Sequence, residues 1–201
     1  MSVDELEART RTELADIVAV LTELTGLPSQ WSGRVELVPG ANFRGKKRFI
    51  CDIQLDADLA DQDTRWTTLI HEALHAVSAG YIREDYQDFQ GWEEGVVEQL
   101  QRFVRAHVLS RLRVTIDPQV LRRLDEEHAY NKYIAALETI REAQGIPATQ
   151  AEAYYFELIQ TPIKDRQSHV NRYGFSLPPS LRADFFAVIS AASAILRTRN
   201  R

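Results

Sequence analysis

The stretch His71-Glu72-Ala73-Leu74-His75 constrains this chain most, because it predicts a helix that carries two metal ligands. An α-helix turns about 100° per residue, so residues four apart lie on one face, about one turn from each other. Both imidazoles would therefore reach one metal ion. Glu72 follows His71 directly, so its carboxylate would lie beside the metal, where a general base can take a proton from metal-bound water. A third ligand is still needed.

No downstream histidine is well placed to be that ligand. The metzincin pattern requires Gly three residues and His six residues after the second His, whereas this chain has Ser78 and Tyr81 there. His107, His128 and His169 lie much farther along the chain. A glutamate is therefore the expected third ligand.

Glu94 is the preferred glutamate, and it lies in the segment Gly91-Trp92-Glu93-Glu94-Gly95. Eighteen residues separate it from His75, and Glu98 follows four residues later on the same face of a predicted helix. Glu93 is the competing ligand, about 100° away around that helix. Glu94 is favoured because only Glu94 pairs with Glu98 in this way.

An HExxH motif followed after 18 residues by a Glu within Trp-x-Glu-Gly resembles the gluzincin metallopeptidases, especially their thermolysin-like and aminopeptidase-like groups. The resemblance covers roughly residues 34–112. It implies one zinc ion per chain, bound by His71, His75 and Glu94, with Glu72 as the catalytic base. It also implies that Glu98 accepts the second N–H of a ligating imidazole, with His71 as the expected partner. The implied activity is peptide hydrolysis, and the substrate is a peptide or protein of unknown sequence.

The same resemblance requires a further donor for the negative oxygen of a tetrahedral intermediate, which gluzincins take from a Tyr or His on a later helix. The chain offers several such side chains and the sequence does not choose between them. The candidates are Tyr154, Tyr155, His128, His169, Tyr130, Tyr133 and Tyr173.

Two other functions stay open on the sequence alone. A metal-stabilised protein-binding module would use the ligands to order two helices, without proteolysis. A helical di-iron protein would use Glu72-x-x-His75 and Asp125-x-x-His128, but it would leave His71 without a role. A closed structural zinc site usually takes four ligands, often Cys, and Cys51 is the only thiol, expected in the core of a strand. An open zinc site with three protein ligands is therefore favoured.

Hydrophobic periodicity predicts an α+β fold that is mostly helical. An N-terminal helix is expected over about residues 3–25, with Ser2 and Glu5 as its capping box. A hairpin or small sheet formed by residues 34–38 and 48–55 would pack on the HExxH helix. An edge strand of this sheet could pair with an extended substrate.

The remaining elements are helices. The HExxH helix is expected to begin after residues 61–64 and to end before Gly80, whereas the second ligand-bearing helix would span about residues 92–113. A C-terminal helical part is expected over about residues 117–198. Within it we expect helices over 117–144, over 150–160 and from Ser180 onward, with an irregular segment over 162–179. Residues 1–201 would thus form one zincin-like domain with a core at about 34–112.

Composition predicts a compact cytoplasmic protein. The chain is 44% hydrophobic and 26% charged, with a net charge of −5, so no broad nucleic-acid-binding surface is expected. It has no uninterrupted run of about 18 apolar residues, and its acidic start lacks the basic and apolar regions of a secretory signal. No membrane association is therefore expected, and the oligomeric state is not predicted.

Overall fold

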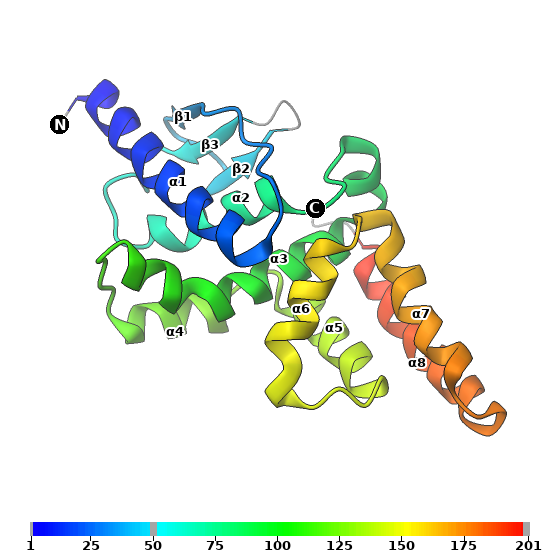
Figure 1. The fold of residues 1–201 in the computed structure, drawn as a ribbon. Helices are drawn as coiled ribbons and strands as arrows, with labels where there is room; N and C mark the ends of the chain where they lie inside the picture. Colours follow the sequence, from blue (N-terminus) through cyan, green and yellow to red (C-terminus); the bar gives the residue numbers. More distant parts are fainter. Residues whose placement is uncertain (1, 49–51, 199–201) are drawn as a thin grey trace. The chain divides into compact units, whose positions relative to one another are not determined.

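The computed structural model describes residues 2–48 and 52–198, and most of these residues are helical (Figure 1). The predicted α+β, mostly helical class is confirmed. The strands are β1 (Val35–Val38), β2 (Gly45–Lys47) and β3 (Ile53–Asp56). The α-helices are α1 (Val3–Thr25), α2 (Arg65–Val77), α3 (Arg83–Arg111), α4 (Pro118–Glu126), α5 (Asn131–Ala143), α6 (Ala151–Gln160), α7 (Arg166–Ser176) and α8 (Pro179–Leu196). Two 3₁₀ turns are η1 (Ala148–Gln150) and η2 (Ile163–Asp165).

The chain divides into two compact units. Unit 1 consists of Met1–Ser78 and Gln101–Asp125, and unit 2 consists of Ala79–Leu100 and Glu126–Arg201. Helix α3 contributes its first part to unit 2 and residues 101–111 to unit 1. The single domain expected from the sequence stays a prediction.

Helix α1 of unit 1 is built as its sequence predicts. The Ser2 hydroxyl accepts a hydrogen bond from the Glu5 backbone N–H, and the Glu5 carboxylate accepts one from the Ser2 N–H, which forms the capping box. The helix buries its apolar stripe and contacts both α2 and β1. Glu13 of α1 accepts two hydrogen bonds from Arg65, at 2.7 and 2.9 Å. This bidentate pair joins α1 to the first turn of α2.

The sheet of unit 1 has the strand order β1-β3-β2, with β1 parallel and β2 antiparallel to β3. A small sheet is therefore confirmed, but the expected second strand over residues 48–55 is wrong in its limits. The polar segment Gly45–Lys47 is paired with β3 at the sheet edge, and β3 begins only at Ile53. Pairing with β3 decided this assignment, because the lysines of β2 carry no apolar alternation. Cys51 lies outside the described residues.

Helix α2 is the most buried helix of unit 1. It lies in contact with α1 and with the edge strand β2, so both of its sides are covered. The helix ends at Val77, and Gly80 has a positive φ of 67°, as expected for a glycine after a helix. The expected capping segment 61–64 lies at the right place, but Thr64 makes no side-chain capping bond.

Some of the helix limits expected after α2 are wrong. Helix α3 extends back to Arg83, but Phe89 has non-helical dihedral angles where two helices meet at a kink, so the expected start at Trp92 lies three residues after that kink. The helix expected over residues 117–144 is divided into α4 and α5, because side chains replace helical hydrogen bonds there: Asn131 Nδ2 donates to the Glu126 carbonyl at 3.0 Å.

Helix α7 lies within the segment 162–179, which had been expected to be irregular. Its sequence is too polar for a clear apolar stripe, and the helix is held by packing on α8 (Figure 1). A Cβ at Gly174 of α7 would lie 2.6 Å from ring atoms of Phe185 in α8. Gly174 therefore permits a close approach of the two helices.

Helix α8 is apolar, and its charged residues are Arg182 and Asp184. By length and composition alone, this helix of 18 residues could cross a membrane, and 28% of it is buried in the structure. The core helix of a soluble protein passes the same test. The absence of a membrane partner stays a prediction.

Candidate metal centre

His71 and His75 meet on one face of α2, as their spacing predicts. Their side chains are buried, and their two Nε2 atoms lie 3.1 Å apart. Two nitrogens bound to one tetrahedral zinc at the usual bond length lie about 3.3 Å apart. The imidazole pair therefore already has the separation that shared binding of one ion requires.

Glu72 is buried beside the histidines and is held by the edge strand. Its Oε2 accepts a hydrogen bond of 2.6 Å from the backbone N–H of Lys47 in β2. The strand approaches α2 closely at Gly45, where a Cβ would lie 2.4 Å from the Thr68 methyl group and 3.0 Å from Cγ of Glu72. The absence of a side chain at Gly45 thus lets β2 lie against the turn of α2 that carries Glu72.

Glu94 is buried in α3 and accepts a hydrogen bond from the Tyr86 hydroxyl through its Oε1. Gln90 Nε2 in turn donates to the Tyr86 oxygen at 3.1 Å. Burial raises the pKa of Tyr86 far above its ordinary value, and the negative charge of Glu94 adds to the effect. Tyr86 therefore stays protonated and acts as a donor to Glu94.

Glu93, the competing candidate for the third ligand, forms an ion pair with an arginine. Its carboxylate forms a 2.7 Å ion pair with Arg166, and both side chains are fully buried. Arg166 also donates to the backbone carbonyls of Trp92 and Leu158, at 3.2 and 2.8 Å. Burial lowers the pKa of Arg166, and the charge of Glu93 opposes that shift. An ion-paired carboxylate is a poor metal ligand, so this arrangement favours Glu94 over Glu93.

His71, His75 and Glu94 are all buried, and together these three residues could hold a metal ion. Two imidazole nitrogens and one carboxylate oxygen are the donors found in catalytic zinc sites with three protein ligands. The donor chemistry therefore fits zinc, although it does not identify the metal.

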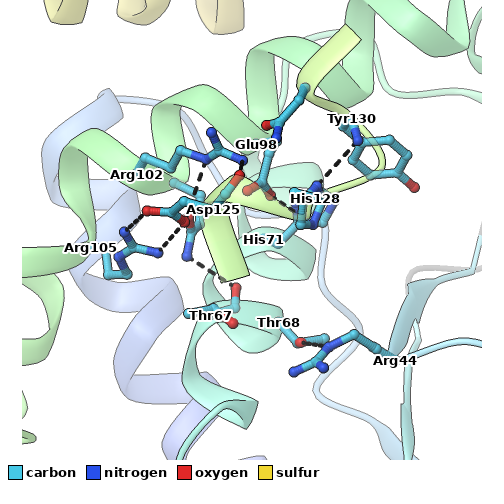
Figure 2. A network of polar contacts seen from close by, with 12 residues as sticks. Arg44, Thr67, Thr68, His71, Glu98, Arg102, Arg105, Asp125, His128 and Tyr130 are labelled. Atoms are coloured by element: carbon cyan, nitrogen blue, oxygen red, sulfur yellow. Dashed lines mark hydrogen bonds and ion pairs between the residues drawn. The ribbon is translucent and has the colours of Figure 1, made fainter. Parts of the chain in front are cut away.

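Glu98 is buried, and its Oε2 lies 3.6 Å from Nε2 of His128 (Figure 2). His128 Nδ1 accepts a hydrogen bond of 3.3 Å from the backbone N–H of Tyr130. Nδ1 is therefore the acceptor and Nε2 carries the proton in a neutral ring, so Nε2–H faces the Glu98 carboxylate. The expected bond between Glu98 and His71 stays a prediction.

Asp125 is engaged by arginines of α3 (Figure 2). Arg105 donates to both carboxylate oxygens, at 2.9 and 2.6 Å, and Arg102 donates to the Asp125 carbonyl at 3.2 Å. A bidentate pair of this kind occupies the oxygens that a metal would need. The ion pair with Arg105 therefore disfavours Asp125 as a metal ligand in the di-iron alternative.

The contacts of the later Tyr and His residues do not identify which of them would donate to the negative oxygen of a tetrahedral intermediate. Tyr155 donates to Glu138 at 2.9 Å, and His169 contacts Glu157 at 3.0 Å. Tyr86 was not among the candidates, because the helix was expected to begin only at Trp92. The contact of Tyr86 with Glu94 depends on the kink at Phe89, which residue spacing does not predict.

Replacing Tyr154 by Phe is expected to raise the free energy of unfolding by about 1 kcal/mol, because an unpaired buried hydroxyl costs that much or more. The Tyr154 hydroxyl is buried and has no hydrogen-bond partner within residues 2–48 and 52–198. Urea unfolding of the metal-free protein would measure the change. The matched Tyr155→Phe variant loses the bond to Glu138 and should be destabilised. If Tyr154→Phe lowered the free energy of unfolding instead, the Tyr154 hydroxyl would have a hydrogen-bond partner and the expectation would be wrong.

The comparisons with known proteins add no further assignment. No protein-family model, no curated protein and no solved structure matches this chain. The roles of the site residues therefore rest on their chemistry and on the geometry above.

Proposed function

We propose that this protein is a zinc-dependent metallopeptidase in which His71, His75 and Glu94 bind the metal and Glu72 is the general base. The observation that carries the proposal is the 3.1 Å separation of the two histidine Nε2 atoms, with Glu72 buried on the same helix. Three protein ligands leave a coordination position for water and substrate, which a closed structural site lacks.

A zinc ion bound there would acidify a water molecule and polarise the carbonyl of the scissile peptide bond. Glu72 is suited to proton transfer, because the hydrogen bond from the Lys47 N–H fixes its carboxylate on the same helix as the two histidines. The protonated Glu72 then delivers its proton to the leaving amine. Burial of His71, Glu72 and His75 limits the access of bulk water and strengthens the electrostatic interactions of the reacting groups.

We propose that the substrate is a peptide in extended conformation that pairs with β2. This strand is at the edge of the sheet, since β3 covers only one of its two sides. An extended peptide can add to such an edge through main-chain hydrogen bonds. The Lys47 N–H already donates to Glu72, so pairing would use the remaining outward-facing main-chain groups of Gly45–Lys47.

Removing and restoring the metal tests the proposal. The purified chain should contain one zinc ion, and it should cleave members of a proteome-derived peptide library. Treatment with a chelator should abolish the cleavage, and one equivalent of zinc should restore the same products. Identical products from the untreated and the metal-free protein would reject the proposal. Bound iron with a visible absorption band would reject it in favour of a di-iron protein.

A further inference from the structure

We propose that Tyr86 is a positioning residue that orients the Glu94 carboxylate as a metal ligand. The Tyr86 hydroxyl donates a hydrogen bond to Oε1 of Glu94, which restricts the orientation of the whole carboxylate. This inference rests on the proposed metal site and goes beyond it, because it assigns a role to a residue outside the HExxH motif and its expected ligand helix.

The contact depends on a kink in α3. Eight residues of a straight α-helix rise about 12 Å, which is too far for a tyrosine side chain to span. Phe89 lies between the two residues and has non-helical dihedral angles, with φ −126° and ψ 30°. The kink brings the first turn of α3 back toward Glu94, so that the Tyr86 hydroxyl reaches its carboxylate.

Tyr86 is itself held in place. Gln90 donates to the phenol oxygen at 3.1 Å, and the Tyr86 ring lies 5.4 Å from the ring of Tyr81 between centroids. A phenol that accepts one hydrogen bond becomes a stronger donor in the next, so Gln90 strengthens the bond from Tyr86 to Glu94. Gln90, Tyr86 and Glu94 thus form a hydrogen-bonded chain that ends on the proposed ligand.

The choice of a neutral donor has a chemical reason. An arginine or lysine would neutralise the carboxylate and compete with a cation for it, as Arg166 does at the neighbouring Glu93. A tyrosine hydroxyl orients the carboxylate and leaves its negative charge for the metal. Glu93 and Glu94 are adjacent on one helix, but their partners suit Glu93 to a buried ion pair and Glu94 to metal binding.

Zinc affinity of the Tyr86→Phe variant tests this role, measured by competition with a chromophoric chelator and without any peptide. Loss of the donor should weaken zinc binding by about 10- to 100-fold. The urea midpoint of the metal-free protein should stay nearly unchanged. If Tyr86 had only a structural role, the midpoint would fall together with the zinc affinity. In the cobalt-substituted protein, the visible absorption bands should change shape, because loss of the phenol lets the Glu94 carboxylate change its orientation at the metal.

Tyr154→Phe is the matched control, because it removes another buried tyrosine hydroxyl, one that has no hydrogen-bond partner among the described residues. Its zinc affinity should equal that of the unmodified protein. Gln90→Leu provides a second variant and should weaken zinc binding by a smaller factor, since the phenol remains. Unchanged zinc affinity in Tyr86→Phe would overturn the inference, as would an equal loss in Tyr154→Phe.

The outcomes separate this inference from the proposed function. Zinc binding that is weakened in Tyr86→Phe, in a protein that cleaves no peptide, would support the inference and reject the peptidase. Peptide cleavage with equal zinc affinity in both proteins would reject the inference alone. A chain that binds no zinc would reject both.

Discussion

Replacing Glu72 by Gln is expected to slow peptide hydrolysis by about 10²- to 10⁴-fold while zinc stays bound, because general-base catalysis contributes a factor of this size. Glutamine has the shape of glutamate, and its amide oxygen can still accept the hydrogen bond from the Lys47 N–H. It cannot take a proton from water. The substitution therefore removes the chemistry and leaves the packing of α2 intact.

The rate would be measured as kcat/KM on one cleaved peptide, together with zinc content per chain. Glu36→Gln is a suitable control, because it is the same change at an exposed position of β1 in the same unit. It should retain both activity and zinc. A Glu72→Gln variant with the activity of the unmodified protein would show that another residue is the base, or that a contaminating peptidase causes the cleavage.

Replacing Arg166 by Met is expected to lower the free energy of unfolding by about 3–5 kcal/mol, because it leaves the buried charge of Glu93 without its partner. Both side chains have no exposed surface, and the two residues are 73 positions apart in the sequence. Methionine has a similar length, so the effect comes from lost charge and hydrogen bonds more than from lost volume. The same change releases the α3 backbone at Trp92.

Urea unfolding of the metal-free protein, followed by circular dichroism, would measure this loss. The double variant Glu93→Gln with Arg166→Met is the control, since it leaves no unpaired charge and should recover part of the stability. The same variants test the division of roles in α3, because Glu93→Gln alone should keep its zinc whereas Glu94→Gln should lose it. The importance of the buried pair would be contradicted if the free energy of unfolding of Arg166→Met stayed within about 1 kcal/mol of that of the unmodified protein, because the loss of one partner should cost several times more.

Local pattern was enough to predict several parts of the protein. The capping box of α1, the helix that carries His71 and His75, and the approach of their nitrogens all follow from residue spacing within a few turns. The burial of His71, His75 and Glu94 likewise follows from the apolar residues that flank each motif. These features depend on neighbours in the sequence.

Other features depend on residues far apart, and only the tertiary structure decided them. Gly45–Lys47 is a strand because β3 pairs with it, and α7 is a helix because α8 covers it. Glu93 and Glu94 are identical residues in adjacent positions. Their different roles come from Arg166 at the start of α7 and from the kink that brings Tyr86 back along α3. A periodic pattern encodes which face of a helix is buried, but it does not encode which distant side chain that face meets.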